Sequence, residues 1–144
     1  MGYRNVVTLL QSGNVMFTSP ESNKSNLKST IESGLEKRFH YPAKVIVKDI
    51  PSIKKIINKY PFDSSTTEDQ HYVAFLSQDV VEEMMESAQL NERIEQIAPG
   101  NMVIYWKAKK GMFPMVEFPK LLSKAKYKDL NTVRNIKTLQ KLLQ

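Results

Sequence analysis

The sequence predicts an α+β protein in which helices pack on one face of antiparallel sheets. Three observations support this class. Short runs of strand residues alternate with stretches of helical period, a tight hairpin signal lies near the N-terminus, and a polar run at residues 63–70 separates two halves of similar make-up. We therefore expect two small subdomains, an N-terminal one over residues 1–62 and a C-terminal one over residues 63–144.

The first half opens with a predicted hairpin followed by a helix. Residues 6–18 hold two runs of strand formers, and Gly13 between them can take the positive φ of a tight turn. A helix is expected over residues 24–39, because apolar side chains recur there every four residues and Ser22 or Asn23 can cap it. Those apolar side chains form one stripe along the helix.

The rest of the first half predicts a short strand and a second helix. The strand is expected at residues 43–48, where the sequence is AKVIVK. Asp49 then caps a helix with Pro51 in its first turn, and Pro61 marks its end. The polar run that follows is the best candidate for a boundary between subdomains.

The second half begins with the strand expected at residues 72–76. Its near-continuous apolar character predicts a central position, covered on both faces. An acidic helix is expected from Asp79, with a further helical turn from Asn91 to Ile97 that Pro99 ends.

The last third of the chain predicts a second hairpin and two helices. A strand at residues 102–108 is expected to pair with an edge strand at 112–118, since Pro114 is tolerated only at an edge. A short helix is expected at residues 120–127, and Thr132 is expected to cap the last helix.

The composition is that of an ordinary soluble domain. The 144 residues are 41% hydrophobic and 25% charged, and no apolar run is long enough for a membrane span. The absence of cysteine excludes a disulfide framework and thiol catalysis, and it fits a cytoplasmic protein. We expect no cofactor and no metal, because His40 and His71 have no metal-ligand or triad spacing, and no phosphate-binding loop or dinucleotide fingerprint is present.

Charge is distributed unevenly along the chain. The formal charge is +6 over residues 1–62, −8 over residues 63–95 and +8 over residues 107–144. Two consequences are open: the basic segments attract a polyanion, or they lie against the acidic helix of the same chain.

Three stretches resemble the DUF1697 family of uncharacterised, mostly bacterial proteins. They are QSGNVMF at residues 11–17, HYVAFL at 71–76 and TVRNIKTLQKLL at 132–143. The resemblance implies ferredoxin-like sheets and no established activity. Ile136 and Lys137 stand where members of that family often have Trp-Asn, which weakens any function that depends on those groups.

The same resemblance implies an incomplete N-terminus. Members of that family begin with a further strand and helix, so the chain is expected to be a truncated form whose sheet lacks one strand. Unpaired backbone groups along the resulting edge would favour a homodimer.

The most interesting polar cluster lies at the start of the last predicted helix. A helix N-terminus offers unpaired N–H groups, and an arginine beside it can bind an anion with a fork of donors. The candidate anion-binding residues are Thr132, Arg134, Asn135 and Lys137, joined by Gln11, Ser12 and Asn14 if the hairpin tip packs nearby. The structural alternatives are an Arg134 paired with a carboxylate, a Thr132 that only caps, and turn chemistry that accounts for residues 12–14.

These features favour a non-catalytic module that binds nucleic acid or a phosphorylated small molecule. Strand alternation would also direct one of Tyr105 and Trp106 away from the core, where it stacks a ligand or covers a helix. Two other functions stay open: an interaction domain that oligomerises through the exposed sheet edge, and an enzyme whose site is completed by the missing N-terminal segment.

Overall fold

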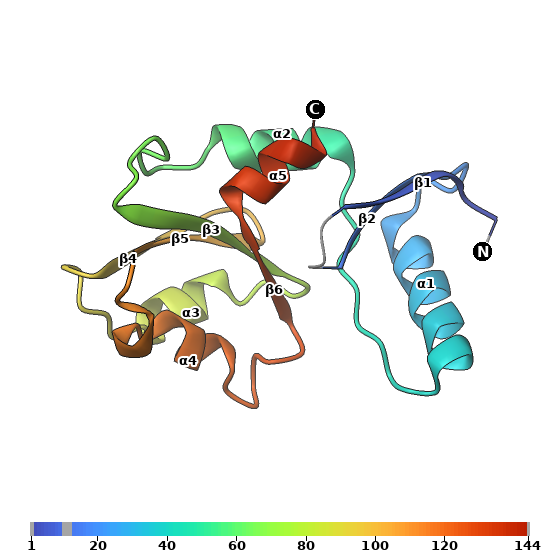
Figure 1. Cartoon of the computed structure of the whole chain (residues 1–144). Coiled ribbons are helices and arrows are strands. Elements are labelled where there is room, and N and C mark those ends of the chain that lie inside the picture. The colour runs from blue at the N-terminus through green and yellow to red at the C-terminus, as the bar shows by residue number, and fades with distance from the viewer. Residues whose placement is uncertain (1, 10–12, 144) are drawn as a thin grey trace. The chain divides into compact units, whose positions relative to one another are not determined.

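The computed structural model describes residues 2–9 and 13–143, and its helices and antiparallel sheets confirm the α+β class (Figure 1). The chain divides between Asp49 and Ile50 into two compact units. No helix in the described part of the chain has the length and apolar character needed to cross a membrane.

The first unit contains a hairpin and one helix. Strands β1 (Arg4–Leu9) and β2 (Asn14–Thr18) pair antiparallel, and helix α1 (Lys24–Phe39) follows. The helix begins where the sequence predicts, because the side chain of Asn23 accepts a hydrogen bond from the N–H of Asn26 at 3.1 Å. The hairpin and α1 are therefore confirmed.

The prediction of a strand at residues 43–48 is wrong. Those residues belong to no helix or strand in the structure. A β-strand needs a neighbour whose backbone groups complete its hydrogen bonds, and a local AKVIVK pattern cannot supply that neighbour. The segment instead connects α1 to the second unit.

The second unit is built on one four-stranded sheet whose strand order is β4-β5-β3-β6, with every neighbouring pair antiparallel. Its elements are, in chain order, α2 (Ile50–Asn58), β3 (Asp69–Leu76), α3 (Val81–Ser87), β4 (Glu95–Pro99), β5 (Val103–Lys109), a 3₁₀ turn (Phe113–Met115), α4 (Phe118–Leu122), β6 (Asn131–Asn135) and α5 (Ile136–Leu142). The run from β3 to β6 has the β-α-β-β-α-β order of a ferredoxin-like fold.

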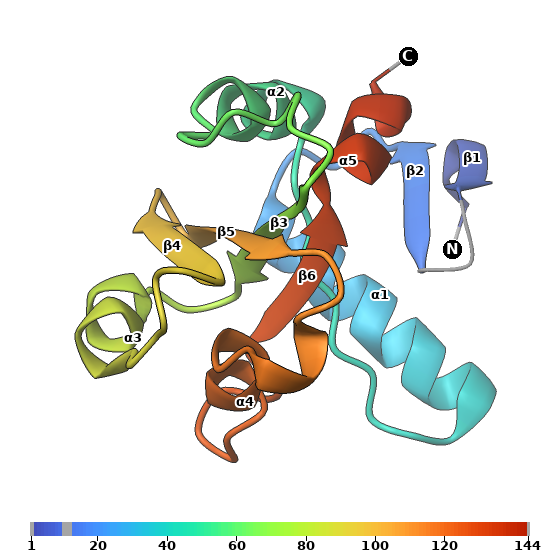
Figure 2. The ribbon, with the colours of Figure 1, turned by 60° about the vertical axis from the view of Figure 1, so that its left-hand side comes forward.

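Helices cover both faces of this sheet, which corrects the expectation of helices on one face. Figures 1 and 2 show α2 and α5 on one side of the strands, with α3 and α4 on the other. Strand alternation supplies apolar side chains to both layers: Val73 and Tyr105 on one face, Ala74 and Trp106 on the other, all at most 3% exposed. The central, doubly covered position predicted for residues 72–76 is confirmed.

Because both faces are covered, neither aromatic residue of β5 faces solvent. Tyr105 donates a hydrogen bond to the carbonyl of Ile56 in α2, at 2.9 Å. On the other face of the sheet, Trp106 stacks on Tyr72, with ring centroids 4.8 Å apart. Neither is placed to stack a base.

The partner of β5 differs from the expected one. The helical turn expected from Asn91 to Ile97 is a turn at residues 92–94 followed by the start of β4, which pairs with β5. Residues 112–118 contain the 3₁₀ turn and the start of α4 instead of a strand. Pro114 lacks the N–H that a strand would donate, which suits a turn. β4 takes the position next to β5 through a short hairpin at Gly100.

The last helix also begins later than expected, and Thr132 does not cap it. Thr132 lies in β6 opposite Phe75, and Asn135 caps α5 by accepting a hydrogen bond from the N–H of Lys137 at 2.8 Å. Pairing with β3 extends β6 as far as Asn135, so the cap moves with the end of the strand.

The two compact units divide between Asp49 and Ile50, and the subdomain boundary expected between residues 62 and 63 stays a prediction. Helix α2 is part of the second unit because it packs on the sheet: Ile56 is 8% exposed, and its carbonyl accepts the Tyr105 hydrogen bond. Residues 63–68 of the polar run belong to the loop that joins α2 to β3 inside that unit, and Asp69 and Gln70 already belong to β3.

Candidate functional site

Four of the predicted anion-binding residues, Thr132, Arg134, Asn135 and Lys137, lie along the chain at the junction of β6 and α5. Arg134 donates from Nη1 to the hydroxyl of Thr132 at 2.7 Å and to the carbonyl of Val133 at 2.8 Å. Burial lowers the pKa of the Arg134 guanidinium from its usual value, but an arginine stays charged at any physiological pH. The junction therefore holds a fixed positive charge on an edge strand.

Asn135 and Lys137 have separate roles at the same junction. The Asn135 side chain is used as the cap of α5, while the Lys137 side chain extends from an exposed position on that helix. Helix α5 has seven residues, so the positive charge of the junction comes mainly from Arg134 and Lys137 rather than from the helix dipole.

The hairpin residues predicted for this site belong to the other compact unit or lie outside the described residues. Asn14 lies in β2 of the first unit, and Gln11 and Ser12 lie outside the described residues. Their participation in an anion site stays a prediction.

Most lysines near the C-terminus are not neutralised by a carboxylate. Two of the nine lysines between residues 107 and 143 form an ion pair with another described residue: Lys120 with Glu117 at 3.3 Å, and Lys126 with Glu83 of α3. The Lys126 pair shows that the basic segment does contact the acidic helix at one point. The other seven lysines form no ion pair with a described residue.

A second polar cluster surrounds His71, at one end of β3. His71 is 4% exposed, and its Nδ1 and Nε2 lie 2.8 Å from the hydroxyl of Tyr60 and 3.0 Å from the hydroxyl of Thr66. Burial lowers the pKa of His71 and raises that of Tyr60, so both side chains are neutral near pH 7. With both ring nitrogens occupied, His71 ties Thr66 of the polar loop and Tyr60, just after α2, to the sheet.

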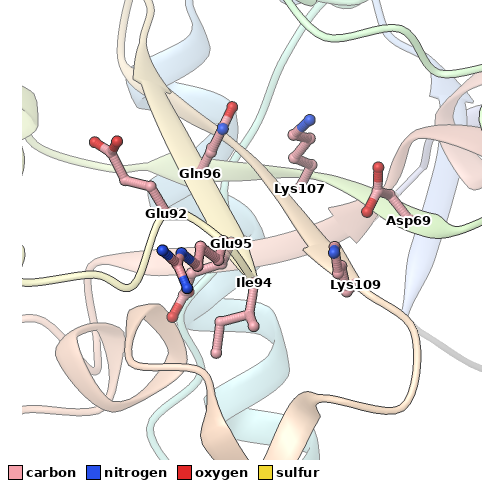
Figure 3. A pocket seen from close by; sticks show the side chains of 8 residues that line it. Asp69, Glu92, Ile94, Glu95, Gln96, Lys107 and Lys109 are labelled. Atoms are coloured by element: carbon pink, nitrogen blue, oxygen red, sulfur yellow. The ribbon is translucent and has the colours of Figure 1, made fainter.

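A small cavity of about 200 Å³ lies at the same end of the sheet (Figure 3). It is lined by Asp69, Glu92, Arg93, Ile94, Glu95, Gln96, Lys107 and Lys109. Strand register explains the gathering, because Lys107 is opposite both Gln96 and His71, and Lys109 is opposite Asp69.

Glu95 is the one buried carboxylate of that lining. It is 2% exposed and accepts hydrogen bonds from the indole N–H of Trp106 at 3.1 Å and from the backbone N–H groups of Glu117 and Phe118. These bonds join β4 to the start of α4. Glu95 is thus a structural anchor, and its charge is already balanced by donors of the protein.

Sequence reasoning missed the lining of this cavity. Lys107 and Lys109 were visible only as members of a basic segment, and Asp69 only as part of a polar loop. The available signal was their alternation on one strand face, but that signal has meaning only after the partner strands and their register are known.

No group of three histidine, aspartate or glutamate side chains in the described residues could hold a metal ion.

Comparison with known proteins gives a family and a fold. A family model described as a protein of unknown function, DUF1697, matches residues 1–105. Among solved structures, the conserved bacterial protein SP0830 from Streptococcus pneumoniae is similar at a TM-score of 0.81 and 23% identity, over 98% of this chain and 79% of that one. No curated protein matches the chain.

Proposed function

The chain belongs to the DUF1697 family of proteins of unknown function, and from that premise we propose that it is a non-catalytic module that binds an anionic partner. The observation that supports this function is the unbalanced charge near the C-terminus. Seven of nine lysines there have no ion pair with a described residue, although the same chain carries a formal charge of −8 over residues 63–95. Charge that the protein does not neutralise itself is available to an external anion.

Nucleic acid is the partner that this surface fits best. Its phosphates are repeated anions, and lysines distributed over several elements can contact them without a shaped pocket. Arg134 adds a guanidinium already oriented by Thr132 and Val133, and such a group loses less freedom when it binds a phosphate. Both Tyr105 and Trp106 are buried, so binding is expected to depend on phosphates rather than on base stacking.

Fluorescence anisotropy with labelled single-stranded RNA and duplex DNA tests this function. The double variant Arg134→Ala with Lys137→Ala is expected to raise the Kd about tenfold at low salt. It is also expected to reduce the slope of the logarithm of the binding constant against the logarithm of the salt concentration by about 2. The matched control is Arg38→Ala with Lys37→Ala in the last turn of α1, which removes the same charge and is expected to change the Kd less than about twofold.

Two results would contradict the function. Absence of binding to either nucleic acid at low salt would show that the positive surface serves no polyanion. Equal weakening in the two double variants would show only a general attraction to net charge.

A second candidate function is self-association through the β1–β2 hairpin. Val6, Val7 and Val15 are 55%, 49% and 53% exposed, and the two strands form a sheet with no third strand among the described residues. An isolated two-stranded sheet is marginal, and its edges offer unpaired backbone groups to another chain. A second copy of the hairpin would supply both apolar surface and hydrogen-bond partners.

A further inference from the structure

The cavity at the end of β3, β4 and β5 combines groups of opposite charge that do not neutralise one another. None of Arg93, Lys107 and Lys109 has a carboxylate of the described residues within 4.0 Å of its charged nitrogens. Two carboxylates, those of Asp69 and Glu92, line the same small space. The three cations of the lining are thus not neutralised by its carboxylates.

The backbone sets these positions. Lys107 and Lys109 are alternate residues of β5 and so share one face, with Gln96 opposite Lys107 and Asp69 opposite Lys109. Figure 3 shows the Gln96, Lys107 and Asp69 side chains on the same side of the strands. The Lys107 ammonium also lies 5.4 Å from the ring centroid of Phe62, a cation–π contact that limits its movement.

The chemistry of the lining selects the ligand. Three cations in one small space suit an anion with several oxygens, such as a phosphate monoester, because each oxygen can accept a charged hydrogen bond. Carboxylates repel that anion but accept hydrogen bonds from hydroxyl groups, and the Gln96 amide can donate or accept. A volume of about 200 Å³ suits a ligand of a few carbons better than a nucleotide.

We propose that this cavity binds a small phosphorylated polyhydroxy compound, of the size of a pentose phosphate. Arg93, Lys107 and Lys109 hold the phosphate, and Asp69, Glu92 and Gln96 receive the hydroxyl groups. The site is separate from Arg134 and Lys137 and does not depend on the proposed binding of nucleic acid.

Isothermal titration calorimetry of the full chain with ribose 5-phosphate tests this site, with inorganic phosphate and ribose as partial probes. We expect ribose 5-phosphate to bind at least about tenfold more tightly than either partial probe, since only it engages both halves of the lining. Lys107→Ala with Lys109→Ala is expected to weaken it about tenfold or more. The matched control, Lys110→Ala with Lys124→Ala, removes the same charge outside the cavity and is expected to bind as the natural protein does.

A second variant separates the roles of the two halves. Asp69→Asn removes a strong acceptor for a ligand hydroxyl group, so it is expected to weaken the binding of ribose 5-phosphate. The same variant is expected to bind inorganic phosphate as tightly as the natural protein does, or more tightly, because a negative charge has been removed. This comparison also gives a result if the double lysine variant does not fold.

Three outcomes would overturn the proposal. They are no heat of binding from any probe up to about 10 mM, equal losses in the two lysine double variants, or tighter binding of a zwitterion such as serine than of ribose 5-phosphate. Arg134→Ala with Lys137→Ala is expected to keep ribose 5-phosphate binding, so failure here and failure of the nucleic-acid function can be told apart.

Discussion

The environment of His71 predicts how the stability of the protein depends on pH. It is nearly fully buried, it bridges Tyr60 and Thr66, and burial is the main reason its pKa lies below the usual 6.5. The neighbouring charges oppose one another, because Asp69 and Asp63 raise this pKa and Lys107 lowers it. The folded state therefore prefers the neutral imidazole.

This preference makes stability depend on pH. Between pH 6.5 and the lower pKa of the folded state, the unfolded chain binds more protons at this histidine than the folded chain does. Neutral His71 therefore makes its full contribution to the free energy of unfolding above pH 6.5. That contribution is lost as the pH falls from 6.5 through the lower pKa of the folded state.

We expect the Tm to fall from pH about 7.5 to pH about 5.5, and we expect His71→Asn to reduce that fall. The control is His40→Asn at the end of α1, where asparagine tolerates the left-handed conformation (φ 60°) that His40 adopts. Differential scanning calorimetry at the two pH values measures the effect. The same pH response in His71→Asn as in the natural protein would contradict it.

At the scale of elements, the β4–β5 hairpin is the connection that places the cavity. Its turn is closed by a hydrogen bond from the N–H of Gly100 to the carbonyl of Val103, at 2.9 Å. A Cβ on Gly100 would lie 2.6 Å from Cγ2 of Val103 and 2.9 Å from Cε2 of Tyr105, and both side chains are buried. The side chains of Val103 and Tyr105 therefore leave no space at position 100 for a residue larger than glycine.

Gly100→Ala is expected to lower the free energy of unfolding by about 1–3 kcal/mol, because the buried neighbours must move to admit the methyl group. Asn101→Ala, at the exposed next position of the turn, is expected to change it by less than about 0.5 kcal/mol. Urea denaturation followed by circular dichroism measures both. Equal stability of the Gly100→Ala variant and the natural protein would show that the turn relaxes freely.

At the scale of the whole molecule, the two units differ in how much apolar surface they bury. The second unit has a continuous core that includes Phe118, Met84 and Ile104, each fully buried. In helix α1 of the first unit, Leu27 is the buried residue, while valines of the hairpin stay half exposed. Exposed apolar surface of this kind favours association.

Size-exclusion chromatography with light scattering is expected to give twice the chain mass at high protein concentration. Val6→Lys is expected to shift the protein to monomer, since a charge at a strand edge opposes pairing with another chain. Met115→Lys, at a residue of the second unit that is 62% exposed, is the control and is expected to stay dimeric. A monomer at every concentration, or equal loss of dimer in both variants, would contradict association through the hairpin.

The features that could be predicted from sequence depend on local chemistry. The hairpin near Gly13, the helix that follows the Asn23 cap and the central position of residues 72–76 each follow from a few adjacent residues. Turn geometry, capping and apolar continuity act over that short range, so the pattern is sufficient.

The sequence by itself thus determined the α+β class, the first hairpin and the helix after it, the central strand and the surplus of positive charge near the C-terminus. Only the tertiary structure decided that β4 pairs with β5, that Thr132 lies in a strand, and that helices cover both faces of the sheet. It also placed Lys107 and Lys109 beside Asp69 and Gln96. The physical reason is that strand partners are chosen by hydrogen bonds and packing between segments far apart in the chain, which no local pattern encodes.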